Sequence, residues 1–325
     1  MARPSLPLPP SDDGPRVSGT LLLRTGGDDD TWADVLSRMG PLPGLDAPPG
    51  PDAPTAGGPR RRLVTVDDPG WSDATAEEVR AALDRDGVWV PDLVLLVTAE
   101  TAADPDLRPL LALRPSDGEA FRICPRQAAL THLVLYRPYI DMTLERFEGR
   151  GSDGAVPVGA YLETLDPAPR YEPPARPLPA LVQGNDGLLV RTDFTDGDAW
   201  AALVETVRRP GPEGFGDIID DYGDHIDFVD DPAFDGASPE QLMAAVLPDP
   251  EDSGQPAADV VLVVDAVTLG HPEHPVLVVP LEDHPGCAFR LAAETVGIMV
   301  VNLAIANQDL EDYMDDRTRD LVMPR

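Results

Sequence analysis

Three aspartates in the second half of the chain stand where carboxylates could bind a metal ion. Asp193, Asp230 and Asp265 each follow a short apolar run of the kind that forms a buried strand. In a parallel α/β sheet, ligands bind outside the carboxyl ends of the strands, where these side chains would meet. Oxygen ligands suit Mg²⁺ or Ca²⁺, and Mg²⁺ there would serve phosphoryl chemistry. One hypothesis is therefore a divalent-metal-dependent enzyme, similar to a phosphohydrolase, with these three residues as ligands.

Further polar residues that could form a site lie in a loop and in the last helical segment. His271 and His274 offer imidazoles in a proline-rich loop, but zinc needs a third or fourth ligand in tetrahedral geometry, and no Cys-x-x-Cys lies nearby. Asn302 and Asn307 follow an apolar run, and an asparagine inside an apolar helix needs a partner. We expect Asn302 to bond to neighbouring backbone. The alternative is a pocket that these asparagines line with the strand-end aspartates, with the two histidines as further candidates.

The net charge of the chain is −33, and it is unevenly distributed. Residues 185–318 contain 29 acidic residues and five arginines, whereas residues 17–147 contain 21 and 13. Such a field repels nucleic acids and anionic membranes and attracts basic protein surfaces, although it also serves plain solubility. We expect neither a nucleic-acid nor a membrane partner, and a basic protein partner is the main functional hypothesis. The predicted interaction residues lie within residues 213–235 and are Asp217, Asp220, Asp221 and Asp224.

Signatures of nucleophilic catalysis and of phosphate loops are missing from the sequence. It has no Gly-x-Ser-x-Gly, and a phosphate loop needs a lysine, whereas all 25 basic residues are arginine. This absence favours a non-catalytic regulatory or toxin-neutralising protein over an enzyme. The two cysteines, Cys124 and Cys287, lie in apolar surroundings and are typical of free thiols in a reducing cytoplasm. No apolar run approaches the roughly 18 residues of a membrane span.

Two stretches of similar design indicate how the chain is organised. Residues 258–281 and 91–113 each contain an apolar run, a polar residue, a proline-containing loop and a second apolar run. Leu21–Arg24 likewise matches Leu188–Arg191, and Thr65–Trp71 matches Phe228–Phe234. The matches keep their order at an offset of 163 to 168 residues, which indicates an internal duplication.

The duplication predicts two α/β domains, each with a mixed sheet of about five strands flanked by helices. Helices join the first three strands, which makes them parallel, and short turns make the last two antiparallel. Whether the repeats pair within one chain or between chains stays open. The predicted boundaries are a disordered tail at 1–16, repeat one at 17–147, a Pro/Gly-rich linker at 148–184, repeat two at 185–318 and a tail at 319–325.

The second repeat carries four segments that mark a resemblance to a known family. They are LLVRTDF at 188–194, VDDP at 229–232, HPEHPVL at 271–277 and NLAIANQDLEDY at 302–313. In these segments, residues 185–315 resemble an uncharacterised domain-of-unknown-function family that is common in actinobacterial proteins. Repeat one is similar to a divergent copy without the histidine loop. The resemblance implies the domain but no activity, cofactor or substrate.

Comparison of the two repeats separates framework residues from candidate site residues. Repeat one has Gly26 and Thr98 where repeat two has Asp193 and Asp265, so these two aspartates are site candidates. The plain alternative is structural, because an aspartate between a strand and a helix is a common N-cap. Two arginine positions recur in both repeats: Arg24 corresponds to Arg191, and Arg122 corresponds to Arg290. We expect each arginine to form an ion pair with the Asp-Asp segment of its own repeat.

Overall fold

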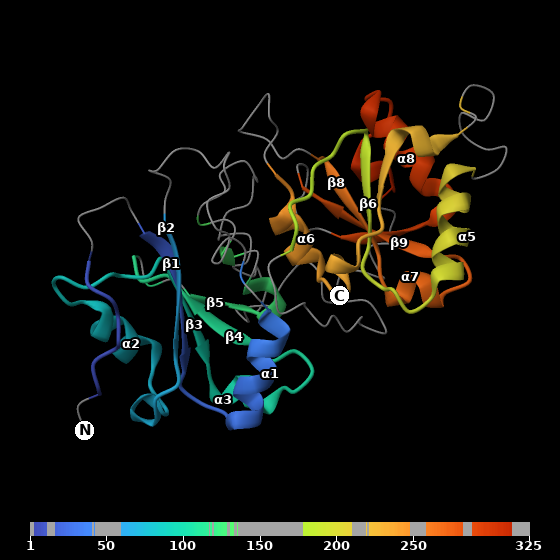
Figure 1. Ribbon diagram of the computed structural model, residues 1–325. Coiled ribbons are helices and arrows are strands. Elements are labelled where there is room, and N and C mark those ends of the chain that lie inside the picture. Colours follow the sequence, from blue (N-terminus) through green and yellow to red (C-terminus); the bar gives the residue numbers. More distant parts are fainter. Residues whose placement is uncertain are drawn as a thin grey trace. The chain divides into compact units, whose positions relative to one another are not determined.

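Two structural units, unit 1 and unit 2, account for the described residues (Figure 1). The computed structural model describes residues 3–11, 17–40, 42, 60–116, 118, 120–128, 131–132, 135, 178–209, 219, 221–247, 258–281 and 288–313. Unit 1 contains those up to residue 135, and unit 2 contains those from residue 178 onward. Within these ranges, no helix is long and apolar enough to cross a membrane.

Unit 1 is a five-stranded mixed sheet with helices on both faces. Its elements in chain order are β1 (Val17–Arg24), α1 (Asp29–Met39), β2 (Arg60–Val66), η1 (Pro69–Trp71), α2 (Ala76–Leu83), β3 (Leu93–Val97), α3 (Ala99–Ala103), β4 (Leu110–Leu113), β5 (Ala120–Ile123) and η2 (Pro125–Gln127). The strand order is β2-β1-β3-β4-β5. β1 is parallel to β2 and β3, whereas β4 is antiparallel to β3 and β5. Figure 1 shows α2 on one face and α1 and α3 on the other.

Unit 2 repeats this topology with the order β7-β6-β8-β9-β10. Its elements are β6 (Gly187–Arg191), α5 (Gly197–Arg208), η4 (Tyr222–His225), β7 (Ile226–Val229), η5 (Pro232–Phe234), α6 (Pro239–Ala245), β8 (Val260–Val264), α7 (Ala266–Gly270), β9 (Pro275–Pro280), β10 (Phe289–Ala292), α8 (Ala293–Ala304) and η6 (Leu310–Tyr313). β6, β7 and β8 are parallel, and β9 is antiparallel to β8 and β10. The predicted fold of two duplicated mixed α/β domains is therefore confirmed.

The duplication extends to single hydrogen bonds. The backbone N–H of Thr25 donates to the carbonyl of Val97 at 2.8 Å, and that of Thr192 donates to Val264 at 2.9 Å. The hydroxyls of the two threonines bond to the same carbonyls, at 3.1 Å and 3.3 Å. The first and third strands of each unit are thus tied together just beyond their carboxyl ends in the same way.

The short helices α3 and α7 stand where the sequence predicts only a proline-containing loop. Each follows its strand directly and makes about one turn. The hydroxyl of Thr101 in α3 donates to the Pro109 carbonyl at 2.6 Å, and that of Thr268 in α7 donates to Pro275 at 3.0 Å. A helix of five residues is too short to show an apolar period, which explains the missed elements.

Helix beginnings are set by side-chain caps. Thr75 caps α2 in a capping box with Glu78. Asp28 caps α1, since its side chain accepts the N–H of Thr31 at 2.9 Å. Of the predicted linker, residues 148–177 lie outside the described residues, as does the predicted tail at 319–325.

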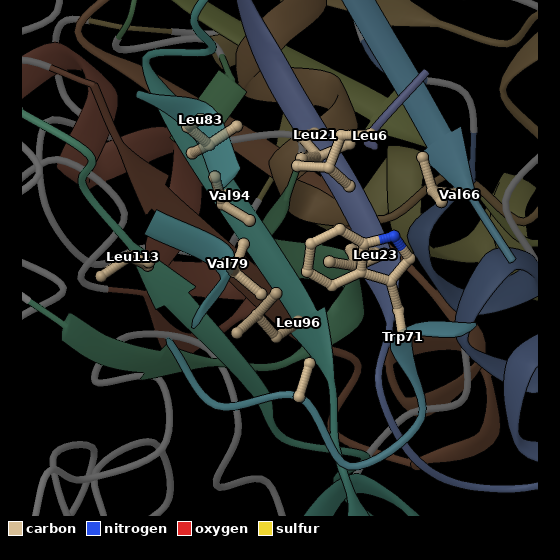
Figure 2. Close-up of a cluster of buried hydrophobic side chains, with 11 residues drawn as sticks. Leu6, Leu21, Leu23, Val66, Trp71, Val79, Leu83, Val94, Leu96 and Leu113 are labelled. Carbon is tan, nitrogen blue, oxygen red and sulfur yellow. The ribbon is translucent and has the colours of Figure 1, made fainter. Parts of the chain in front are cut away.

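The predicted disordered tail is ordered between residues 3 and 11, which we call the strap. Leu6 of the strap is 2% exposed and belongs to an apolar cluster on the α2 side of the sheet. Figure 2 shows Leu6 next to Leu21, with Trp71 and Leu23 nearby in the same cluster. The correction has a simple cause, because apolar leucines alternate with the prolines and can be buried against the sheet.

Candidate functional site

Arg191 ends β6 and organises the carboxyl edge of the unit 2 sheet. Its Nε donates to the carbonyl of Asp193 at 2.8 Å, and its Nη2 donates to that of Asp196 at 3.2 Å. Nη1 donates to Oδ1 of Asp230 at 3.1 Å, and the guanidinium lies 4.4 Å from the ring centre of Phe194. The predicted pairing of Arg191 with the Asp-Asp segment is confirmed, and this buried arginine is part of the framework.

The three aspartates of the metal hypothesis have different protein partners. Asp193 Oδ1 accepts the backbone N–H of Thr195 at 2.8 Å, and Asp230 accepts from Arg191. Asp265 is buried, whereas Asp230 keeps 48% of its side chain exposed. Among the residues that the structure describes, no group of three or more His, Cys, Asp or Glu side chains could hold a metal ion. The structure therefore does not bring the three carboxylates together as ligands.

Asp265 is instead half of a buried ion pair with Arg290 of β10. Arg290 Nη1 donates to Oδ1 at 3.0 Å and Nη2 donates to Oδ2 at 2.6 Å, and each side chain is 3% exposed. Asp265 also caps α7 by accepting the N–H of Thr268 at 3.0 Å. The expected pairing of Arg290 with the Asp-Asp segment after β7 is wrong, because three strands separate β7 from β10 in the sheet.

Unit 1 lacks this carboxylate, because Thr98 occupies the position of Asp265. Arg122, the counterpart of Arg290, pairs with Glu100, whose side chain is 63% exposed. The Asp-Asp pairing expected for Arg122 is therefore also wrong, whereas Arg24 does bind Asp67, at 3.2 Å. Burial lowers the pKa of Arg122. Repeat two thus differs from repeat one by a better-satisfied buried arginine, which accounts for Asp265 in structural terms.

Replacing Thr98 by aspartate is expected to raise the free energy of unfolding of unit 1 by about 1 kcal/mol. Aspartate would cap α3 as Asp265 caps α7 and would give Arg122 a buried partner. Hydrogen exchange of β3 peptides measures the change. Thr98→Asn is the control, since it supplies a cap without charge, and a gain no larger than the control's would contradict the role given to Asp265.

The two histidines close the loop between α7 and β9. With a protonated Nδ1, His274 donates to the Thr268 carbonyl at 3.1 Å, and its φ of 44° is left-handed. His271 Nδ1 accepts the N–H of Glu273 at 3.2 Å. In unit 1, Arg108 has the same left-handed backbone before a proline and donates to carbonyls of α3. Unit 1 closes the corresponding loop with an arginine in place of a histidine. We therefore assign His274 a structural role.

Asn302 lies at the centre of a polar network that holds the segment after α8. Its Nδ2 donates to Gln308 Oε1 at 2.6 Å and to Tyr313 Oη at 2.7 Å, and its Oδ1 accepts from Asn307 Nδ2 at 2.9 Å. The Tyr313 hydroxyl donates to Gln308 Oε1 at 2.6 Å, and burial raises the pKa of Tyr313. The expectation that the Asn302 side chain bonds to backbone is wrong, because its partners are side chains of the next segment.

The predicted pocket is divided between opposite edges of the unit 2 sheet. A Cβ on Gly187, at the start of β6, would lie 2.9 Å from Val300, so the end of α8 with Asn302 and Asn307 lies near the amino end of β6. The strand-end aspartates follow the carboxyl ends of the strands, as does the loop of His271 and His274. The asparagines thus stabilise the fold at one edge and do not join the other candidates.

The predicted interaction residues fall into three situations. Asp217 and Asp220 lie outside the described residues. Asp221 accepts from Arg208 Nε at 3.1 Å and caps η4, and the hydrogen bond from Arg208 lowers the pKa of its carboxyl group. Asp224 is exposed. Beyond η4, Asp231 and Asp235 are exposed on the loop after β7.

A family model covers most of the chain, whereas no curated protein matches it. The model describes a domain of unknown function, DUF6924, and it matches residues 19–141 and again residues 186–323. The two matches fall on the two units with the same strand order. The chain therefore belongs to the DUF6924 family, and it contains two copies of that domain.

Proposed function

We propose that the protein is a non-catalytic binding protein that recognises a basic protein partner through acidic residues beside β7. A regulatory or toxin-neutralising role is consistent with this activity. The proposed surface, called the β7 margin, consists of the exposed residues Asp224, Asp231 and Asp235, and it adjoins Asp230, which pairs with Arg191. β7 is an edge strand of its sheet, so this margin lies at the side of the sheet.

The observation that carries the proposal is that the arginines of unit 2 are already paired with acidic residues of the same unit. Within the described part of unit 2, each arginine is engaged in an internal ion pair: Arg191 with Asp230, Arg208 and Arg209 with Asp221, and Arg290 with Asp265. These arginines are thus held by particular carboxylates and cannot neutralise the remaining acids. An exposed excess of negative charge steers basic proteins toward the surface and raises their association rate.

The two units differ in charge at the beginning of this edge strand. β2 carries Arg62, whereas the residue that corresponds in register before β7 is His225, and the acidic Asp224 precedes it. A basic partner is therefore expected to prefer unit 2. We also propose a cytoplasmic location, which the free, buried Cys124 supports because unpaired thiols persist in reducing compartments.

The triple variant Asp224→Asn, Asp231→Asn and Asp235→Asn is expected to weaken partner binding about tenfold at low salt. Asparagine keeps the size of each side chain and preserves the N-cap of Asp231 on η5. Proteins captured by the immobilised full chain are identified. Their affinities for the natural chain and for the triple variant are then measured over a range of NaCl concentrations.

The control removes the same charge from unit 1 through Asp68→Asn, Asp73→Asn and Asp84→Asn, all at exposed positions. Partners should have basic surfaces, should bind more weakly as salt rises, and should bind this control as they bind the natural chain. Partners that bind the β7-margin variant unchanged would refute the proposal.

A further inference from the structure

The strap contacts unit 1 through two anchors, Arg3 and Leu6. The Arg3 guanidinium donates from Nη2 to Glu78 Oε2 at 2.9 Å and from Nη1 to the carbonyls of Gly70 at 3.3 Å and Ser72 at 2.7 Å. Leu6 fills the apolar cluster beneath α2. Proline-rich segments favour a helix of three residues per turn, which places residues three apart on one side. The spacing of the anchors therefore suits a short peptide lying on a surface.

The rest of the strap is fastened by backbone hydrogen bonds. The N–H of Trp89 donates to the Pro9 carbonyl at 2.9 Å, and the N–H of Ser11 donates to Gly87 at 2.9 Å. Arg85 Nη2 donates to the Leu6 carbonyl at 2.8 Å. Contacts through a few side chains and the backbone of an extended segment are the usual means by which proteins bind peptides.

The surface beneath the strap carries features that unit 2 lacks. A Cβ on Gly70 would lie 2.6 Å from Cγ of Pro4, so only glycine leaves room for this proline. The corresponding residue of unit 2 is Ala233, and Gln241 takes the place of Glu78 in the capping box. Unit 1 therefore has space for a proline at Gly70 and a carboxylate for an arginine at Glu78, whereas unit 2 has neither. The capping box itself does not require the carboxylate, because Gln241 completes it in unit 2.

The strap buries little apolar surface, since Leu8 is only partly buried against the cluster that Leu6 fills. Leu6 is its one buried side chain, and Pro4, Ser5, Pro7, Pro10 and Ser11 are exposed. A segment with so little buried apolar surface opens at a lower free energy than the sheet beneath it. The contacts that it releases remain available, because Gly70 belongs to η1, Ser72 caps the end of η1, and Glu78 belongs to α2.

We propose that the surface beneath the strap is a peptide-binding site for proline-rich segments of the pattern Arg-Pro-x-Leu on another protein, and that the strap occupies it in the resting molecule. We call this surface the strap site. Its defining residues are Gly70, Ser72, Glu78, Arg85 and Trp89, with the apolar cluster under Leu6. The site is separate from the β7 margin and does not depend on it.

A second copy of the chain is a poor occupant of the strap site. Its strap would make the same contacts as the resident strap, yet it would lose the advantage of attachment, which corresponds to an effective concentration on the order of millimolar. A partner segment that makes the Arg-Pro-x-Leu contacts and adds contacts beyond them displaces the strap, whereas a segment limited to the strap's own contacts does not. The full chain is therefore expected to sediment as a monomer, and a strap-exchanged dimer would overturn the assignment to a separate partner.

The test uses the full chain and a fluorescein-labelled peptide with the sequence of residues 2–11. In the variant Arg3→Ala with Leu6→Ala, the resident strap no longer competes, so peptide affinity is expected to be at least about tenfold higher than for the natural chain. Fluorescence anisotropy measures both affinities. Equal affinities, or equal binding of a scrambled peptide, would overturn the proposal.

Two further substitutions, each added to the variant Arg3→Ala with Leu6→Ala, distinguish a specific peptide site from non-specific binding. Gly70→Ala should obstruct the proline, and Glu78→Gln should remove the charged partner while keeping the capping box, as Gln241 does in unit 2. Each is expected to weaken peptide binding by about tenfold. Hydrogen exchange of β3 verifies that unit 1 stays folded, and Arg3→Ala alone, which keeps Leu6, serves if the double variant unfolds. Unchanged binding by both variants with β3 protected would refute the site.

Lowering the pH should weaken the ion pair between Glu78 and the arginine of the bound peptide. The hydrogen bond from Arg3 lowers the pKa of the Glu78 carboxyl group, so the attraction is complete above the ordinary pKa of this carboxyl group and is lost as pH falls through its lowered value. Peptide affinity should thus fall on acidification with Glu78 and should stay level with Glu78→Gln. A fall of equal size in both would contradict the role of this carboxylate.

Discussion

Replacing Arg290 by methionine is expected to lower the free energy of unfolding of unit 2 by about 3–5 kcal/mol. The substitution leaves the carboxylate of Asp265 buried without its two-point partner, and a buried unpaired charge is costly. Methionine fills much of the space of the arginine stem, so little of the loss comes from a cavity. Hydrogen exchange of peptides from β8, measured against those from β3, reports the stability of unit 2 separately from that of unit 1.

Two controls separate the ion pair from general damage at this position. Arg122→Met removes the counterpart in unit 1, whose partner Glu100 is largely exposed, and should cost unit 1 less. Adding Asp265→Thr to Arg290→Met removes both charges and should restore much of the loss, because the two residues are in direct contact. Equal losses for Arg290→Met and Arg122→Met, or no recovery in the double variant, would contradict a buried pair.

The second large effect is expected from Asn302→Ala, which should destabilise unit 2 by about 2–3 kcal/mol. Asn302 is 4% exposed, and its side chain makes hydrogen bonds to Gln308, Tyr313 and Asn307. Alanine removes these bonds at once and frees the segment that ends in η6. Hydrogen exchange should therefore increase first in residues 307–313 and only then in α8.

Asn307→Ala is the matched control, because Asn307 is exposed and makes one side-chain bond within the network. Its cost should stay below about 1 kcal/mol. If the two substitutions destabilised unit 2 equally, or if residues 307–313 stayed as protected as before, the network would not hold the end of α8.

The sheet framework could be predicted from the sequence because its strands are short, apolar and duplicated. The two apolar runs within residues 91–113 form the strands β3 and β4. Helices between the first three strands then required parallel pairing, whatever the side chains. Repetition strengthened each assignment, since a segment that is ambiguous in one repeat has a clearer counterpart in the other.

The candidate site could not be predicted to the same extent, because partner choice depends on strand order. The sequence indicated that Arg290 is part of the framework. It did not indicate that three strands separate β10 from β7 or that Arg290 lies within hydrogen-bond distance of Asp265. The strap was missed for a related reason. Arg3 and Leu6 contact residues 67 to 79 positions away, and a proline-rich segment has no local period that would reveal such contacts.

The sheet order has a consequence for how each unit is made on the ribosome. β1 and β6 are the first strands of their units to be synthesised, yet each lies between two strands that are made later. Val97 follows Arg24 by 73 residues, and Val264 follows Arg191 by the same number. At about 5–20 residues per second, each first strand waits roughly 4–15 s for its second neighbour. The leucines of β1 and β6 are therefore exposed to chaperones twice during translation, once for each copy of the domain.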